Sequence, residues 1–230
     1  MRHFWNFTVQ NNERVLRLDG AISDETWWGD EVTPAAFRAD LEAGTGDITV
    51  WINSPGGDVF AAAQIYNMLK EYAGKVTVKI DGLAASAASV IAMAGDEILM
   101  SPVSHMVIHN PATVAIGDSD EMLRAKEMLD ELKEGIVNAY ELKTGLPRTG
   151  ISRLMKEESC FNAKKAVDLG FADGILYSEN STVTATLNPV IFSRVLATNS
   201  LINKIPKTQK VRNSIKFTTL ENRINKLKYR

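Results

Sequence analysis

Two short β-branched runs, each followed by small residues and then a helical pattern, constrain the fold of this chain most strongly. The first, ITVWIN at 48–53, leads through Ser54-Pro55-Gly56-Gly57 into a helix that Asp58 can cap and that reaches about residue 72. The second, VTVKI at 76–80, ends at Asp81-Gly82 and leads into a helix of small residues reaching 94. Repeated strand–helix units of this kind predict an α/β fold.

The same alternation continues on both sides of these units. Short apolar runs predict further strands at 15–18, 97–100, 103–108 and 174–177. Helical patterns are predicted at 30–41, 118–143, 149–156 and 163–169. The longest of them, 118–143, carries an apolar stripe opposite a densely charged side; the stripe consists of Met122, Leu129, Leu132, Ile136, Val137 and Tyr140.

The composition is that of a globular chain. Of 230 residues, 45 % are hydrophobic and 23 % charged, which is enough apolar mass for a core. The single cysteine, Cys160, excludes an intrachain disulfide and a cysteine-based zinc site. The N-terminus has no apolar run of signal-peptide length, and the longest stretch of apolar and small residues, 83–94, is too short to cross a bilayer. We therefore expect a soluble, cytoplasmic protein without a membrane partner.

Charge divides the chain into two parts. Residues 1–180 hold 16 Lys and Arg against 27 Asp and Glu, whereas residues 181–230 hold 10 against one. This shift predicts a folded domain over 1–180 and a basic polar tail over 181–230, partly helical or disordered. The acidic body argues against nucleic acid as the main ligand. The tail has nucleic acid, an acidic protein surface or its own body as candidate partners.

The turn at Gly56-Gly57 is a candidate oxyanion hole. Adjacent glycines permit backbone angles that other residues avoid, and N–H groups at a strand-to-helix turn point outward. Such amides can stabilise a developing negative charge on oxygen. An ordinary tight turn is the alternative. A Walker A loop is excluded because no Gly-Lys-Ser/Thr follows.

Ser86 is the candidate nucleophile. It stands at the start of a helix and is surrounded by alanines, which leave room for a substrate carbonyl, and the N–H of Ala87 is available to an oxyanion. The alternative is a small-residue helix packed tightly on a sheet. Ser89, one turn further on, is expected to be structural.

The chain has three histidines with which Ser86 could pair. His3 lies near the N-terminus, while His105 and His109 share one face of the predicted strand 103–108 and its end. His109 is favoured because catalytic side chains are more common at strand ends than in strand interiors.

A carboxylate is needed to orient such a histidine. Glu158 and Glu157 are the candidates, and both are equally compatible with solvated charges at a helix end. The nearby Cys160 precedes the apolar Phe161 and is predicted to be a buried structural thiol rather than a nucleophile.

Four segments of the chain together resemble the Clp protease proteolytic subunit family (ClpP). The matching strings are INSPGGDVFAAAQIYNML, DGLAASAASVIAMAG, SHMVIHNP and FNAKKAVDLGFADGIL, and they occur in family order across about residues 14–178. The chain looks most similar to the phage branch of that family, the ClpP-related head maturation proteases.

The resemblance implies a role for each candidate residue. Ser86 matches the nucleophile, His109 the general base, and Gly57 and Ala87 the donors of the oxyanion-hole amides. Glu158 stands where the family usually has an aspartate, and Glu157 is the reserve candidate. No metal or organic cofactor is implied.

The resemblance also implies an architecture and partners. The fold would be a crotonase-like ββα superhelix, with 118–143 as a long protruding helix, in a ring that is a heptamer or tetradecamer. Peptides or proteins would be the substrates, and a phage scaffold or capsid protein and an ATPase unfoldase are candidate partners.

Three activities follow as alternatives. The expected one is a serine endopeptidase of phage prohead maturation, and the second is ATP-dependent Clp-type degradation. The third is an acyl-CoA hydratase or isomerase of the crotonase superfamily, against which the pairing of Ser86 with a downstream His109 argues.

Overall fold

A computed structural model describes residues 4–10, 13–23 and 34–177, all of which belong to one compact unit, Met1–Pro189. The predicted tail 181–230, the start of the predicted helix at 30–33 and His3 lie outside the described residues. The division into a domain at 1–180 and a tail therefore stays a prediction.

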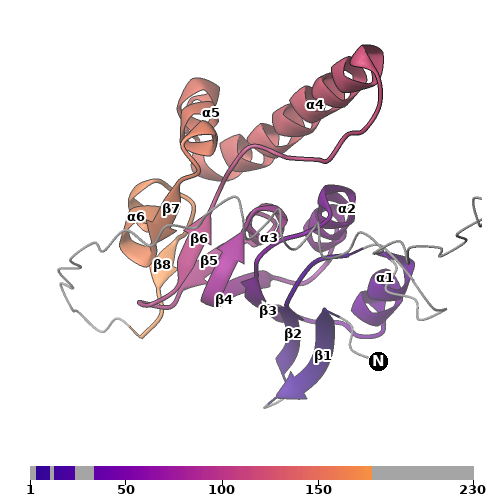
Figure 1. The fold of residues 1–230 in the computed structure, drawn as a ribbon. Coiled ribbons are helices and arrows are strands. Elements are labelled where there is room, and N and C mark those ends of the chain that lie inside the picture. Colours follow the sequence, from indigo (N-terminus) through magenta and orange to yellow (C-terminus); the bar gives the residue numbers. More distant parts are fainter. Residues whose placement is uncertain (1–3, 11–12, 24–33, 178–230) are drawn as a thin grey trace, which may run out of the picture. The chain divides into compact units, whose positions relative to one another are not determined.

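Helices and strands alternate along most of the described chain (Figure 1). The strands are β1 (Trp5–Gln10), β2 (Glu13–Asp19), β3 (Ile48–Ser54), β4 (Val76–Ala85), β5 (Glu97–Met100), β6 (His105–Val107), β7 (Cys160–Asn162) and β8 (Gly174–Ile175). The helices are α1 (Pro34–Glu42), α2 (Val59–Lys70), α3 (Ala87–Ala92), α4 (Ser119–Thr144), α5 (Arg148–Lys156) and α6 (Ala163–Asp168).

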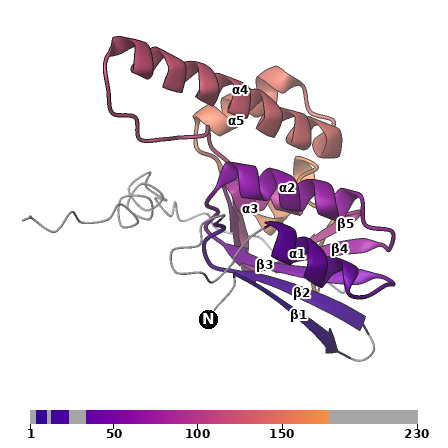
Figure 2. The same cartoon turned by 90° about the vertical axis from the view of Figure 1, so that its right-hand side faces the viewer.

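One mixed sheet organises these elements. Its strands follow the order β1-β2-β3-β4-β5-β8, while β6 pairs with β4 and β7. Strands β2, β3, β4, β5 and β8 are parallel, and β1 runs antiparallel to β2. Helices α1, α2 and α3 cover one face of the sheet (Figure 2). One row of residues in register across β2 to β5 is fully buried: Leu16, Val50, Val78 and Ile98. The predicted α/β class is confirmed.

Strand β4 is longer than its sequence pattern predicts. The pattern VTVKI followed by Asp81-Gly82 predicts an end at Ile80, whereas β4 continues to Ala85. The added residues pair with β6, so that Ala85 lies opposite Val107. Pairing with a distant segment thus overrides a local turn signal. As a result, β4 ends directly before Ser86.

Two strands have no counterpart in the predicted elements. Strand β1 lies in the N-terminal segment and is held by tertiary contacts: Trp5 packs edge-on against Phe37 at 5.6 Å and donates its indole N–H to Asp40 Oδ2 at 2.9 Å. Strand β7 has only three residues and pairs antiparallel with β6. Strand β7 depends on a partner far away in the sequence, which a local pattern cannot indicate. Strand β1 pairs with the next strand, β2, with Gln10 opposite Glu13, so a local hairpin pattern was available and was missed.

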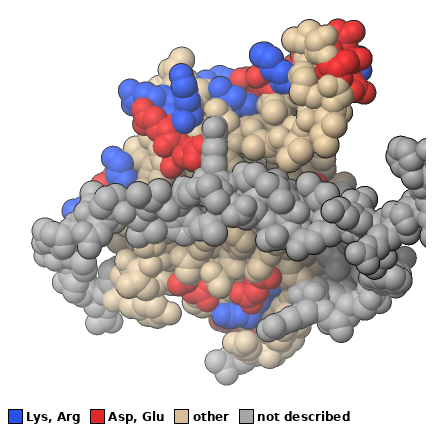
Figure 3. Space-filling model, viewed as in Figure 1, with Lys and Arg blue, Asp and Glu red and all other residues tan. Residues whose placement is uncertain are grey.

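Helix α4 begins and ends at strong capping signals. Asp118 and Glu121 form a capping box at its start, and Gly145 adopts the left-handed conformation at its end. Only the C-terminal half is buried, through Ile136, Val137, Ala139 and Tyr140. Met122, in the predicted apolar stripe, is exposed. The N-terminal half projects past the other helices (Figure 1), and acidic residues gather at its outer end (Figure 3).

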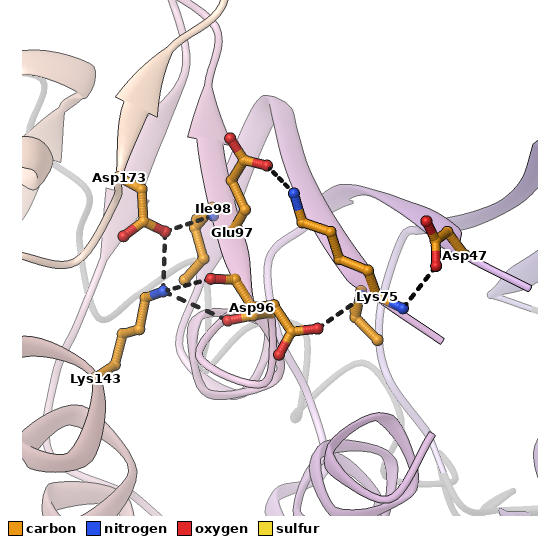
Figure 4. A network of polar contacts seen from close by, with 9 residues as sticks. Asp47, Lys75, Asp96, Glu97, Ile98, Lys143 and Asp173 are labelled. Carbon is orange, nitrogen blue, oxygen red and sulfur yellow. Dashed lines mark hydrogen bonds and ion pairs between the residues drawn. The ribbon is translucent and has the colours of Figure 1, made fainter. Parts of the chain in front are cut away.

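Polar contacts anchor the C-terminal end of α4 to the sheet (Figure 4). Lys143 Nζ lies 2.8 Å from Asp173 Oδ2 and 3.4 Å from the carbonyl oxygens of Gly95 and Asp96. Asp173 also accepts the Ile98 N–H at 2.7 Å, so one carboxylate joins α4 to the start of β5. Among the helices described, none is long and apolar enough to span a membrane.

Candidate active site

Ser86 occupies a strained turn between β4 and α3. Its backbone has φ 55° and ψ −126°, in a region that residues with a side chain rarely adopt. It is half-buried, and its N–H donates to the Val107 carbonyl at 2.8 Å. A sharp strand-to-helix turn of this kind presents a serine hydroxyl outward at the end of a sheet, which is how nucleophilic serines are held in other α/β enzymes.

The glycine turn after β3 packs directly on this serine. A Cβ placed on Gly56 would lie 2.6 Å from the Ala85 carbonyl oxygen, 2.8 Å from Ser86 Cβ and 3.0 Å from the Ala87 nitrogen. Only glycine therefore allows the two turns to approach this closely. The two segments predicted separately as oxyanion hole and nucleophile are brought together.

Gly57 and Ala87 have unused backbone N–H groups. Ile22 bonds both neighbours of Gly57, donating to the Gly56 carbonyl at 2.9 Å and accepting from Asp58 at 3.0 Å. The Gly57 N–H therefore points away from Ile22, as strand pairing requires. Among the described residues, neither the Gly57 nor the Ala87 N–H has a hydrogen-bond acceptor. Both amides are open to a ligand oxygen.

A buried serine that the sequence interpretation missed supports the glycine turn. Ser54 Oγ donates to the Gly20 carbonyl at 2.6 Å and accepts the Gly56 N–H at 3.1 Å. The signal available was a serine two residues before Gly56, a spacing typical of hydroxyl-stabilised turns. The predicted cap on the following helix is confirmed, because Asp58 accepts the Ala61 N–H at 2.7 Å.

Two backbone hydrogen bonds align the histidine and glutamate segments with Ser86. The Ser86 N–H bonds the Val107 carbonyl, and the Ile108 N–H, one residue on, bonds the Ser159 carbonyl at 3.0 Å. His109 comes directly after Ile108, two residues beyond the end of β6. The chain thus carries Ser86, His109 and the residues beside Ser159 to one edge of the sheet.

The hydrogen bond at the His109 ring determines which ring nitrogen carries the hydrogen. Nδ1 lies 2.6 Å from the Asn110 carbonyl oxygen, which can only accept, so Nδ1 carries the hydrogen. In the neutral ring this leaves the lone pair of Nε2 available as a base. His105, in contrast, begins β6 and pairs within the sheet with Leu83 and Asn162. Its place is further from the serine turn along the strand.

Glu158 and Glu157 differ clearly in conformation. Helix α5 ends in a Schellman motif, in which the Glu158 N–H bonds the Met155 carbonyl and the Ser159 N–H bonds the Leu154 carbonyl, each at 3.2 Å. Glu158 occupies the left-handed position at φ 51°, where glycine is usual, and is half-buried. Glu157 is right-handed and exposed. A non-glycine residue in this place suggests a role for its side chain.

Cys160 is exposed, which contradicts the predicted buried thiol. It lies opposite Val107 on β7, which pairs with β6 alone among the described strands, so Cys160 stands on an edge strand of the sheet. Partial burial still raises the pKa of its thiol, so the nucleophilic thiolate is disfavoured. Among the described residues, no group of three His, Cys, Asp or Glu side chains could hold a metal ion.

A serine in a strained strand-to-helix turn, with two open amides beside it in an α/β fold, defines a serine hydrolase. The family model described as Clp protease matches residues 3–179 of the chain. The protein therefore belongs to the Clp protease family and is a serine peptidase.

Curated relatives agree with this assignment. The chain is 29 % identical over 168 residues to the ATP-dependent Clp protease proteolytic subunit of Oltmannsiellopsis viridis, covering 72 % of this chain and 85 % of the relative. It is 30 % identical over 166 residues to the protein of the same name from Ligilactobacillus salivarius, covering 71 % and 83 %. With proteolytic subunit 1 of Chlamydia caviae it shares 35 % over 132 residues, covering 55 % and 69 %.

Proposed function

We propose that this protein is an endopeptidase in which Ser86, His109 and Glu158 act as a catalytic triad. Ser86 Oγ attacks a peptide carbonyl while Nε2 of His109 takes its proton. The Asn110 carbonyl holds the Nδ1–H of His109, and the charge of Glu158 stabilises the imidazolium. The tetrahedral intermediate expels the amine, which receives the proton from His109. Water then hydrolyses the resulting ester on Ser86 by the same steps in reverse order.

The observation that carries this proposal is the strained backbone of Ser86. A φ of 55° at a serine has a conformational cost of about 1–3 kcal/mol, and the Ser86 Cβ lies directly beside the glycine turn. A serine that merely packed a helix on the sheet would not need this conformation.

The proposed oxyanion hole consists of the Gly57 and Ala87 N–H groups. They come from the two turns that Gly56 holds in contact, and both lack acceptors among the described residues. Each is part of a fixed backbone, so little reorganisation is needed when charge develops on the substrate oxygen. This arrangement accounts for two adjacent glycines after β3.

The biological role has two candidates. The relatives are named as ATP-dependent proteolytic subunits, which favours degradation of substrates delivered by an ATPase. Phage prohead maturation rests on the motif resemblance in the sequence. In both cases we propose a homo-oligomeric ring, a heptamer or tetradecamer, that encloses the site.

Intact-mass measurement after fluorophosphonate treatment tests the proposal. We expect one adduct on the wild-type protein and none on Ser86→Ala. Ser104→Ala is the matched control. Ser104 is fully buried, and its hydroxyl donates to the Ser101 carbonyl, not to Ser86. An adduct on Ser86→Ala, or hydrolysis of unfolded casein by that variant, would refute the assignment.

Native mass spectrometry and casein hydrolysis with and without a Clp ATPase separate the remaining possibilities. A ring that degrades casein only with the ATPase and ATP supports Clp-type degradation. Activity on casein that the ATPase does not change favours a maturation protease. A monomer that is inert to fluorophosphonate but binds acyl-CoA would replace the peptidase with the crotonase-type alternative.

A further inference from the structure

The buried hydroxyl groups of Tyr140 and Ser89 form a hydrogen-bonded chain to the backbone carbonyl of Ser86, the candidate nucleophile. Ser89 Oγ lies 2.5 Å from the Ser86 carbonyl oxygen and 2.8 Å from Tyr140 Oη. A carbonyl oxygen only accepts, so the Ser89 hydroxyl donates to Ser86. Its single hydrogen is then used, and Tyr140 must donate to Ser89. The direction of the chain is therefore fixed from Tyr140 to Ser89 to Ser86.

The carbonyl that receives this chain belongs to the same peptide group as the Ala87 N–H. It also accepts the Ser89 N–H at 2.9 Å and the Val90 N–H at 3.4 Å. Hydrogen bonds donated to a peptide oxygen polarise the group and strengthen its N–H as a donor. In this protein that N–H is one of the two open amides beside Ser86.

The surroundings keep Tyr140 protonated and in place. Its ring is 1 % exposed and packs edge-on against Phe171 at 5.4 Å. Burial raises the pKa of Tyr140 well above its ordinary value. The tyrosine therefore keeps its proton at neutral pH and stays a donor.

Local packing alone does not explain this arrangement. A serine that bonds a carbonyl three residues earlier is common in helices and needs no partner of its own. Here the Ser89 side chain is completely buried and receives a second hydroxyl from α4, 51 residues later in the chain. Tyr140 is thus linked through Ser89 to the Ser86–Ala87 peptide group of the serine turn.

We infer that Tyr140 and Ser89 are positioning residues of the oxyanion hole. Their hydrogen bonds hold the plane of the Ser86–Ala87 peptide and strengthen the Ala87 N–H as a donor to the substrate oxygen. The inference rests on the proposed function of that amide. Through Tyr140, the buried C-terminal half of α4 would then influence the reaction electrostatically.

The test is the rate of fluorophosphonate inactivation, separated into the maximal rate kinact and the half-saturating concentration KI. Tyr140→Phe removes only the donor and keeps the ring, and Ser89→Ala removes the bond to the Ser86 carbonyl. We expect each to lower kinact about tenfold with KI unchanged, since one oxyanion donor is weakened but not lost. The double variant is expected to be no slower than Ser89→Ala alone.

Tyr72→Phe is the matched control. The Tyr72 hydroxyl accepts from Arg14 at 2.8 Å and donates to the Gly46 carbonyl at 2.8 Å, away from the serine turn. It is expected to keep the wild-type kinact, and thermal unfolding of every variant reports losses of stability.

Three results would overturn the inference: unchanged kinact in Tyr140→Phe, independent and multiplying effects of the two substitutions, or a loss of folding in Tyr140→Phe at the assay temperature. The last would make the hydroxyl structural. A wild-type protein that fluorophosphonate does not label would instead refute the proposed function.

Discussion

Gly56 and Ser86 lie in direct contact, and a Cβ on the glycine would be 2.8 Å from the Cβ of the serine. The contact joins the turn after β3 to the turn after β4, two adjacent parallel strands. Both turns lie at the carboxyl ends of their strands, the edge at which open α/β sheets bind ligands. The proposed nucleophile and both proposed oxyanion donors depend on this single approach.

Gly56→Ala is expected to abolish fluorophosphonate labelling. The new Cβ would also lie 2.6 Å from the Ala85 carbonyl oxygen, and φ is +89°, so the backbone must shift. We expect at least about a 100-fold loss, as for removal of an oxyanion donor. Gly135→Ala is the control, because its Cβ meets nothing within 4 Å in α4. Wild-type labelling of Gly56→Ala would contradict the proposed site.

Glu158→Gln should slow casein hydrolysis at least about 100-fold, because a neutral amide cannot stabilise the imidazolium of His109. Glu157→Gln is the matched control and should keep nearly full activity, since Glu157 is exposed and right-handed. Glu158→Asp restores the acid usual in the family and should retain measurable turnover. If Glu157→Gln were the inactive variant, the assignment of the acid would be off by one residue.

Most of the fold could be predicted from local patterns. The strands of the sheet interior and the helices that follow them have clear hydrophobic periods and caps, such as Asp58 and the capping box of Asp118. The continuation of β4 past Asp81-Gly82 could not be predicted, because it depends on pairing with β6. Strand β1 was missed for a different reason: it forms a local hairpin with β2, and the short N-terminal segment was not interpreted as a strand.

The residues of the candidate site could be predicted from their types and spacing, but the hydrogen bonds between them could not. Ser86 and the glycine turn stood out by composition, and the structure brings them into contact. The link from Tyr140 to Ser89 was not predictable, because Tyr140 is simply one member of an apolar stripe in the sequence. The left-handed backbone of Glu158 is likewise a consequence of how α5 ends.

Lys143→Met should destabilise the protein, because the Lys143 side chain is 15 % exposed and its ammonium binds Asp173 and two carbonyl oxygens. Hydrogen bonds to charged groups contribute about 1.5–3 kcal/mol, and we expect a loss of that order in urea unfolding. Lys75→Met is the control: Lys75 pairs with Glu97 at 2.6 Å in the same region (Figure 4), but its side chain is 53 % exposed. Solvent screens that pair, so a smaller change is expected. Equal losses in both variants would show that burial of Lys143 contributes nothing.

Cys160 should react slowly with iodoacetamide at neutral pH although it is exposed. Partial burial raises the pKa of its thiol, so at pH 7 less thiolate is present than in an ordinary cysteine. The alkylation rate, followed by intact mass from pH 7 to 10, is expected to rise at a higher pH than that of a short cysteine peptide.

The raised pKa of Cys160 also makes the free energy of unfolding depend on pH. The folded state favours the neutral thiol, so the stability that the thiol contributes is fully present below the thiol pKa of the unfolded chain. That contribution is lost as the pH rises through the higher folded pKa. Cys160→Ser should remove this dependence and leave fluorophosphonate labelling of Ser86 unchanged. Loss of labelling in Cys160→Ser, or alkylation as fast as in the peptide at pH 7, would instead indicate an activated thiol at the site.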